Sequence, residues 1–381
     1  MQIVGILAFV AALLFSVMVH EFGHYLTARH YGMKVSEFFL GFGKRLWSTQ
    51  RGETEFGIKA IPAGGYCRIE GMAPNDQMPE GEESRAFYKA SSGKKLVVLG
   101  AGSLLHFVLG YLLLFTLFAG VGTNQVLPVI GEVVSGSVAQ SVGIQAGDEV
   151  VSINGVKVTN WYKDVEAIRN SGGKELTIGL TRAGQQITVK AKPRLTDVEG
   201  TKRYVLGIVN TVGVKRFGLI SAASNSFKLT KNFITESVKS LVKLPSKVPA
   251  LWGQTVHGEK RDASGLVGVV GVARVSGQAV GDSQLTVSER LATFLLIIAS
   301  LNIFVGIFNL LPILPLDGGH MAVAIADEIR AFFARLRGRP RPAAIDVTVL
   351  TPVTMVVFVI LACLTLLLLV ADVINPVTLN L

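Results

Sequence analysis

The chain has 381 residues, of which 50% are hydrophobic and 17% are charged, and its net charge is +10. This is the composition of a membrane protein with several spans. The basic residues are spread beside apolar segments and form no single patch interleaved with aromatic residues. The positive charge therefore indicates membrane topology and contact with anionic lipid. We do not expect a nucleic-acid partner.

Four segments are apolar enough, and at roughly 20 residues long enough, to cross a membrane. In chain order they occupy about residues 3–28, 96–121, 291–311 and 347–370. The first starts at Met1-Gln2-Ile3 without a basic region or a small-residue cleavage site, which predicts a retained anchor. Only two cysteines occur, and Cys363 lies inside the fourth segment, so a disulfide with Cys67 is not expected.

Basic residues are concentrated in two of the loops between these segments. One loop joins the first and second segments, and the other, with arginines between 330 and 341, joins the third and fourth. The positive-inside rule places both loops in the cytoplasm. Both termini and the long region from about 122 to 290 are then expected outside.

The first loop is predicted to contain strands. Residues 54–61 alternate in character and are followed by the glycine turn Gly64-Gly65. Gly41-Phe42-Gly43 and Trp47 suggest a hairpin that dips to the membrane interface. An ordinary cytoplasmic hairpin is an equal alternative.

From about residue 126 to 194, the pattern of apolar and polar residues is typical of a soluble α+β domain. We expect strands at 129–134 and 147–155, the latter ending in the turn Asn154-Gly155, short helices at 137–144 and 161–170, and a hairpin of 175–180 with 186–191. Residues 217–250 are amphipathic and basic, which predicts a helix on the outer membrane surface or one packed on the preceding domain. Residues 265–280 stay unassigned.

The sequence His20-Glu21-Phe22-Gly23-His24 stands at the end of the first apolar segment. Residues four apart share a helix face, so His20 and His24 can both direct an imidazole at one zinc ion. Glu21 beside them can act as general base on a zinc-bound water. Such groups are costly at this depth unless they are bound to something, which favours a metal site over a coincidental pair of surface histidines.

A carboxylate, Asp317, is predicted at membrane depth near the end of the third segment. Catalytic zinc typically takes three protein ligands, and Asp317 is the natural third, although a helix cap is the alternative. Pro312 and Pro315 interrupt the helix, and Gly318-Gly319 let the backbone turn, so that Asp317 can be presented to the metal.

Other polar residues near these motifs receive weaker assignments. Asn309 offers an amide that can hold a substrate backbone or an oxyanion. His320 is placed in the surroundings of the metal rather than among its ligands. The remaining histidines have no matching partner and are interpreted as structural: His30, His106 and His257.

These residues resemble the site-2 protease family (M50) of intramembrane zinc metalloproteases. Its His-Glu-x-x-His motif corresponds to residues 20–24, and its Asn-x-x-Pro-x-x-x-x-Asp-Gly pattern to residues 309–318. Residues 143–148 and 153–155 look like part of a PDZ domain, and a PDZ domain between the second and third spans is the arrangement of the bacterial RseP-type branch. The sequence of residues 32–55 resembles that of actinobacterial members of the family.

The resemblance implies a reaction and its residues. His20, His24 and Asp317 would ligate Zn²⁺, Glu21 would activate water and pass a proton to the leaving amine, and Asn309 would contact the substrate chain. The segment from Gly41 to Arg68 would pair with an extended substrate strand by β-augmentation. The residues we assign to that contact are Gly41, Phe42, Gly43, Gly64, Gly65 and Tyr66.

The resemblance also implies substrates and location. The enzyme would cut within the transmembrane span of single-pass proteins in a bacterial inner membrane. An anti-sigma factor pre-cleaved by a site-1 protease is the expected partner, in the second step of regulated intramembrane proteolysis, with remnant signal peptides as a further possibility. The PDZ domain would be a docking site or a size filter outside the membrane.

Two features depart from the family pattern. Members often carry Gly-Pro-x-x-Asn in the second span, where this chain has Gly102-Ser103-Leu104-Leu105-His106, so His106 takes the place of that asparagine. Tandem PDZ domains occur in some members, whereas the length here leaves room for one.

The predicted fold class is a polytopic α-helical membrane protein with about four transmembrane helices, a membrane-associated β-hairpin region and one extracytoplasmic α+β PDZ domain. The predicted organisation is a first span at 1–30, the hairpin loop at 31–94, a second span at 95–122, the PDZ domain at 123–195, a linker and amphipathic region at 196–288, a third span at 289–320, a basic loop at 321–346, a fourth span at 347–374 and a tail at 375–381.

Two rival functions belong to other classes. A transporter with a relay of His20, Glu21 and Asp317 would predict pseudo-repeats between the halves, and none is visible. A proteolytically inactive scaffold that binds partner C-termini is disfavoured because both motifs are intact. A soluble zinc protease is excluded by the apolar segments.

Overall fold

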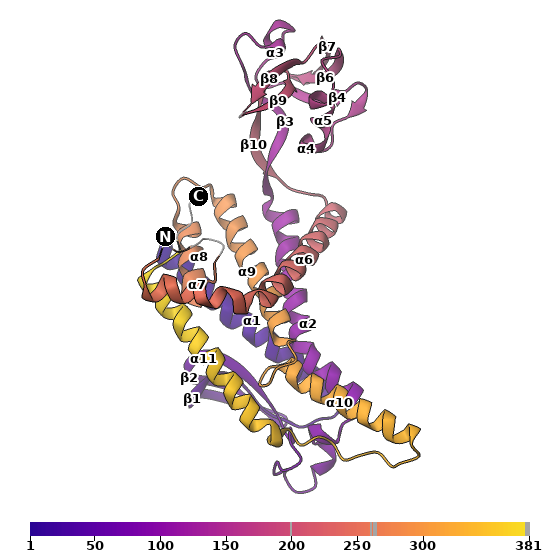
Figure 1. The fold of residues 1–381 in the computed structure, drawn as a ribbon, viewed down its shortest axis with the longest axis vertical. Helices are drawn as coiled ribbons and strands as arrows, with labels where there is room; N and C mark the ends of the chain where they lie inside the picture. The colour runs from indigo at the N-terminus through magenta and orange to yellow at the C-terminus, as the bar shows by residue number, and fades with distance from the viewer. Residues whose placement is uncertain (199, 260, 262–264, 378–381) are drawn as a thin grey trace. The chain divides into compact units, whose positions relative to one another are not determined.

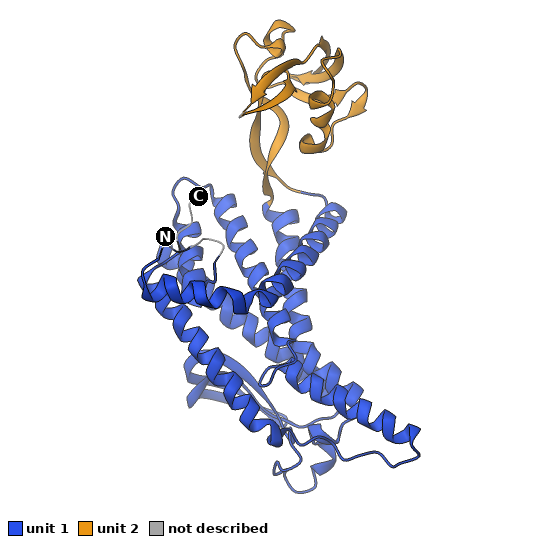
Figure 2. Cartoon of the chain, viewed as in Figure 1, with its two compact units in different colours: residues 1–121, 217–381 blue, residues 122–216 orange. Residues whose placement is uncertain are grey.

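The computed structural model describes residues 1–198, 200–259, 261 and 265–377. Figure 1 shows its elements, and Figure 2 shows the two compact units into which the chain divides. The first unit contains residues 1–121 and 217–381, and the second contains Gly122–Arg216. The last residues of the predicted tail, 378–381, lie outside the described residues.

Among the described residues, four helices are long and apolar enough to cross a membrane, as predicted. They are α1 (Gln2–His30), α2 (Ser92–Thr116) with a π-helical turn to Val121, α9 (Val287–Asn309), and α11 (Thr351–Ile374) with a preceding turn from Val347. Many of their large apolar side chains are exposed, which suits helices whose outer faces meet lipid.

Helix α2 is the centre of the first unit, because it packs against both α1 and α9. A Cβ atom on Gly23 of α1 would lie 2.6 Å from the carbonyl oxygen of Ala101 in α2. A Cβ atom on Gly110 of α2 would lie 2.8 Å from the Ile303 side chain of α9. The helices therefore approach at positions without side chains, as is common between helices in membranes.

Three further helices pack on this bundle. The amphipathic stretch forms α6 (Leu219–Val242) and α7 (Leu244–Val256), and α6 packs against α2 and α9. The stretch that the sequence left unassigned contains α8 (Val269–Gly281), which packs along α1. The region predicted as linker and amphipathic helix thus contributes helices that contact the spans directly.

The loop after α1 forms one antiparallel hairpin, as predicted, from the long strands β1 (Val35–Arg51) and β2 (Thr54–Ile69). Both strands bend, so each contributes two runs to a small sheet. Pairing places the runs in the order 45–51, 54–59, 35–40 and 65–69. The last run, which ends β2, therefore lies at one edge of the sheet.

The chain beyond α9 differs from the predicted boundaries. The third span ends at Asn309, an irregular stretch follows, and α10 (Asp317–Leu336) occupies much of what was expected to be a basic loop. Asp317, which was predicted to lie in the third span, is therefore the first residue of a separate helix. Earlier in the chain, two short 3-10 turns, Glu83–Arg85 and Phe87–Lys89, precede α2.

The second unit is built around a sheet with strand order β10-β3-β4-β6-β7, in which β5 pairs with β4. Its strands are β3 (Thr123–Val133), β4 (Glu149–Ile153), β5 (Val156–Lys157), β6 (Leu176–Arg182), β7 (Gln185–Ala191) and β10 (Ile208–Lys215). A separate hairpin pairs β8 (Arg194–Val198) with β9 (Thr201–Val205), and the short helices are α3 (Val138–Ser141), α4 (Trp161–Asp164) and α5 (Glu166–Arg169).

The local predictions for this unit agree with its elements, but its end does not. Asn154 and Gly155 both have positive φ between β4 and β5, which is the geometry of the predicted Asn-Gly turn. Trp161 and Ile168 of the predicted helix enter the core with residues of the sheet. The compact unit ends at Arg216, not at residue 195, because β10 pairs with β3 and closes the sheet.

An ion pair between a buried carboxylate and a half-buried arginine stabilises the second unit. Asp148 is completely buried and accepts hydrogen bonds from Arg182 at 2.7 and 2.8 Å and from the Gln145 amide at 2.9 Å. The Arg182 guanidinium holds the pKa of the Asp148 carboxyl below its usual range. The pair therefore stabilises the fold fully above the unfolded pKa of about 4, and the contribution is lost as pH falls through the lower folded value.

We expect Arg182→Leu to destabilise the second unit by about 2–3 kcal/mol at pH 7, because it leaves the Asp148 carboxylate buried without its charged partner. Arg169→Leu is the matched control, since its pair with Glu166 is exposed and should contribute less than about 1 kcal/mol. Hydrogen exchange of β4 and β6 in the full chain measures both effects. Equal protection in the two variants at pH 7 contradicts the prediction.

Candidate metal centre and peptide groove

The two histidines of α1 lie on one face, as their spacing predicts. His20 and His24 are each only 7% exposed, and their Nε2 atoms are 3.1 Å apart. The Nδ1 atom of His24 lies 2.8 Å from the carbonyl oxygen of Val98 in α2, so Nδ1 carries the proton and Nε2 keeps a free lone pair. This arrangement prepares His24 as a ligand.

Asp317 joins the pair from the start of α10. Its Oδ2 atom lies 3.2 Å from His20 Nε2 and 3.3 Å from His24 Nε2. A Cβ atom on Gly318 would collide with the backbone of Leu310 and Leu311. The residue after Asp317 must therefore be glycine for the chain to fold back on the end of α9 and deliver the carboxylate.

These three side chains form a group that can hold a metal ion. Ligands about 2.0–2.1 Å from a tetrahedral zinc ion are separated from one another by roughly 3.3 Å. The separations here are 3.1, 3.2 and 3.3 Å. Asp317 Oδ2 is buried and makes no hydrogen bond of good geometry within the described residues, as expected of an atom directed at a cation.

Glu21 is half-buried, and its carboxylate is within electrostatic range of all three side chains of that group. The backbone N–H of Cys67, in the edge run of β2, donates to it. Sequence reasoning missed this contact, since no local pattern links α1 to a strand more than forty residues later. Burial raises the pKa of the Cys67 thiol to about 12, so that thiol is an inert neighbour rather than a nucleophile.

The other residues singled out by the sequence lie on several helices. Asn309 is the last residue of α9 and half-buried, and His320 lies one turn into α10. His30 and His257 are exposed at the ends of α1 and α7. His106, in contrast, is 2% exposed, and its ring centroid lies 4.9 Å from that of His20. The structure thus brings one histidine that was interpreted as structural against the metal group.

The hairpin residues predicted to meet substrate occupy its bends. Gly41, Gly43 and Gly64 have positive φ, and the Phe42 ring stacks on that of Tyr66 with centroids 5.9 Å apart. Gly65 packs on α1, because a Cβ atom there would lie 2.7 Å from the Met18 sulfur. The edge run 65–69 therefore follows α1 toward Glu21.

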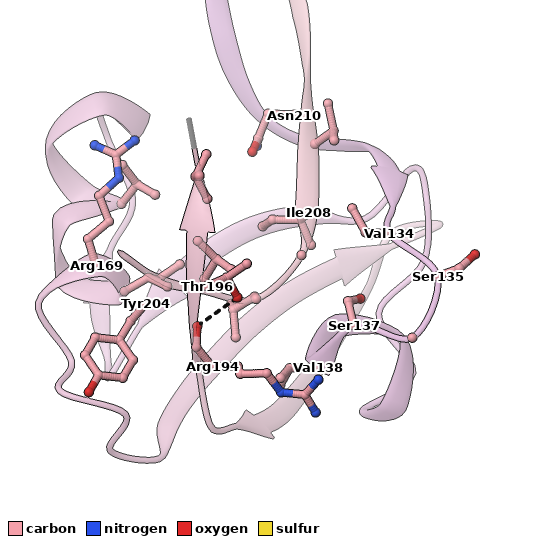
Figure 3. Close-up of a pocket in the computed structure, with 18 of the residues that line it drawn as sticks. Val134, Ser135, Ser137, Val138, Arg169, Arg194, Thr196, Tyr204, Ile208 and Asn210 are labelled. Atoms are coloured by element: carbon pink, nitrogen blue, oxygen red, sulfur yellow. Dashed lines mark hydrogen bonds between the residues drawn. The ribbon is translucent and has the colours of Figure 1, made fainter. Parts of the chain in front are cut away.

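A second concave site lies within the second unit (Figure 3). A groove of about 710 Å³ is bounded by β8, β9 and β10 and by the short helices. Figure 3 labels five of the residues that line it, the apolar Ile208 and Val134 and the polar Ser135, Ser137 and Arg194. Because β10 is the edge strand of its sheet, one wall of the groove is a strand with an outer edge.

Comparison with known proteins identifies the class that this bundle and metal group define. The model of peptidase family M50 matches residues 8–360, and the chain belongs to that family. Zinc metalloprotease Rip1 of Mycobacterium tuberculosis H37Rv is 35% identical over 416 residues, which cover 100% of this chain and 99% of the relative.

Other relatives point to the same family. Rip1 of Mycolicibacterium smegmatis is 34% identical over 98% of both chains, and a protein of Helicobacter pylori is 30% identical over 84% of this chain and 88% of its own. The chain is accordingly a zinc metalloprotease of the site-2 type, with helices fit to cross a membrane, and it is similar to actinobacterial members. The resemblance to the site-2 protease family that the sequence analysis described is confirmed.

The metal group depends on a small residue in α2. A Cβ atom on Gly102 would lie 2.6 Å from His20 Cε1 and from His24 Nε2. We expect Gly102→Ala to displace both rings and to lower zinc affinity by at least about tenfold. Gly100→Ala, on the same helix, meets only the Met321 side chain at 3.8 Å and serves as the control. Zinc titration against a chelator measures both, and unchanged affinity in Gly102→Ala contradicts the geometry.

Proposed function

We propose that this protein hydrolyses a peptide bond within the transmembrane span of single-pass proteins, with zinc held by His20, His24 and Asp317. The observation that carries the proposal is the convergence of three buried ligand atoms, 3.1–3.3 Å apart, among helices fit to cross a membrane. A metal centre in that position can act on peptide bonds that water-soluble proteases do not reach.

Glu21 is the general base in this proposal. Zinc, when bound, lowers the pKa of a water molecule to about 7 and polarises the scissile carbonyl. Glu21 takes the proton of that water and then passes it to the departing amine nitrogen. The Cys67 N–H donates to this carboxylate and helps to fix it beside the metal group.

A helical substrate has to be unwound first, because its peptide bonds are hydrogen-bonded within the helix. The run 65–69 supports a route for this step, since it is the edge of the hairpin sheet and follows α1 toward the base. An unwound substrate segment adds to this edge as a further strand and meets Phe42 and Tyr66. Asn309, half-buried at the end of α9, supplies an amide to the substrate backbone or the oxyanion.

The groove of the second unit is proposed as a docking site or size filter for substrates, in the manner of a PDZ domain. Its apolar wall and its edge strand β10 suit an extended peptide. The proposed substrates have a single span, because one cut within that span is enough to separate the two halves of the protein. Anti-sigma factors pre-cleaved by a site-1 protease fit this class, and remnant signal peptides are the second class.

The proposed orientation follows the distribution of positive charge. The hairpin loop and the arginine-rich stretch after α10 face the cytoplasm, and the second unit and both termini lie outside a bacterial inner membrane.

We expect Glu21→Gln to keep zinc and fold but to lower cleavage of a single-span substrate by at least about 10²-fold, because the amide cannot accept the proton. The substrate lacks its outer domain, both proteins are purified in detergent, and mass spectrometry locates the cut. A cut within the span by wild type alone supports the proposal. Equal cutting by both proteins rules out Glu21 as the base.

We expect Asp317→Ala to lower the zinc content of the purified protein from about one ion per chain toward zero, because only two ligands remain. Asp327→Ala is the control on the same helix, since the Asp327 carboxylate accepts from Arg330 and from the Ile345 amide and belongs to no metal group. Metal analysis after dialysis measures both. Unchanged stoichiometry in Asp317→Ala removes it from the ligands.

A further inference from the structure

The two histidine ligands differ in how their second ring nitrogen is held. His24 Nδ1 is bonded to the Val98 carbonyl at 2.8 Å. His20 Nδ1 is fully buried and has no hydrogen-bond partner within the described residues. Metal-binding histidines almost always donate this N–H to a fixed acceptor, which sets the tautomer and the ring orientation. The acceptor for the N–H of His20 Nδ1 therefore has to be found among its neighbours.

The ring of His106, a polar side chain outside the metal group, contacts the ring of His20. The ring centroids lie 4.9 Å apart with an interplanar angle of 38°, and both residues are buried. His106 stands one helical turn after Gly102, whose missing side chain leaves room for the His20 ring. His106 belongs to α2 and His20 to α1, so the acceptor for His20 would come from a neighbouring helix.

A hydrogen-bond chain fixes which nitrogen of His106 carries the proton. Ser16 donates to the Ala12 carbonyl, and Asn302 of α9 donates through Nδ2 to Ser16 Oγ at 3.1 Å and to the Ile298 carbonyl at 2.8 Å. A carbonyl only accepts, so the amide nitrogen of Asn302 must face Ile298, and its Oδ1 faces His106.

The tautomer of His106 follows from this orientation. Asn302 Oδ1 lies 2.9 Å from His106 Nδ1 and can only accept, so Nδ1 carries the hydrogen. In a neutral imidazole the other nitrogen, Nε2, then keeps a lone pair. His20 is complementary, because it presents Nε2 to the metal group and therefore carries its own hydrogen on Nδ1.

We propose that His106 is a positioning residue of the metal centre: in the metal-bound protein its Nε2 accepts the Nδ1 hydrogen of His20, a bond that the two contacting rings do not make in this structure, and thereby fixes the orientation in which His20 meets the metal. Ser16 and Asn302 hold His106 in the tautomer that this bond requires. The inference rests on the proposed assignment of His20 as a ligand and adds a partner to it from α2.

Ser103 is the competing acceptor on the same turn of α2. It is completely buried, and its hydroxyl oxygen has no partner within the described residues. The His106 ring is favoured because it contacts His20 and because its acceptor nitrogen is fixed by a chain of three bonds. Ser103→Ala separates the two possibilities.

The test measures Zn²⁺ affinity of the purified full chain in detergent by competition with a chelator, and the absorption bands of the Co²⁺ form. His106→Leu removes the acceptor at similar size, and His106→Gln restores an acceptor at the distance of Nε2. We expect about a 10–100-fold loss of Zn²⁺ affinity and altered Co²⁺ bands for His106→Leu, recovery of most of the loss by His106→Gln, and wild-type values for Ser103→Ala.

Three results overturn the inference. They are wild-type affinity in His106→Leu, an equal loss in His106→Leu and His106→Gln, which indicates packing alone, or a loss confined to Ser103→Ala. If His106→Leu does not fold, Asn302→Leu replaces it, since it frees the tautomer of His106 and is expected to weaken Zn²⁺ binding less. Failure of the wild type to bind Zn²⁺ overturns the metal centre itself and is recognised without any variant.

Discussion

Burial of ionisable side chains in an apolar helix bundle is the constraint on which the rest of the structure depends. A polar atom that is hidden from water needs a partner, and inside a membrane no water supplies one. Here the partners come from separate elements. His24 bonds to α2, Glu21 receives an N–H from β2, and Asp317 arrives on α10. The metal group forms only when α1, α2 and α10 have packed together, and Glu21 beside it also needs the hairpin.

Small residues set the distances at which those elements meet. Gly23 lets α1 lie against the backbone of α2, Gly102 leaves space for two imidazole rings, and Gly318 lets the chain after α9 turn back. In each case a single methyl group would collide with backbone or with an imidazole ring. The positions of the three side chains that can hold a metal ion thus depend on these glycines as well as on the three residues themselves.

The need of a buried charged group for a partner also applies where the last span, α11, is attached. Asp372 and Arg261 are both buried and bonded at 2.7 Å, and the Gly271 amide of α8 donates to the same carboxylate at 2.7 Å. Helix α11 otherwise exposes apolar side chains along its length, and its main contacts are with α7 and α8. A paired charge near its end therefore holds this span where apolar packing contributes little.

The sequence by itself determined the four apolar spans, the β-hairpin and the pairing of His20 with His24, because apolar length, strand alternation and four-residue spacing are local properties of a chain. It also indicated that Asp317 joins this pair as a possible metal group, since a buried carboxylate needs a partner. Only the tertiary structure decided that Cys67 meets Glu21, that His106 lies against His20, and that the second unit closes with β10. These contacts join elements far apart in the chain, so they follow from packing, which no local pattern records.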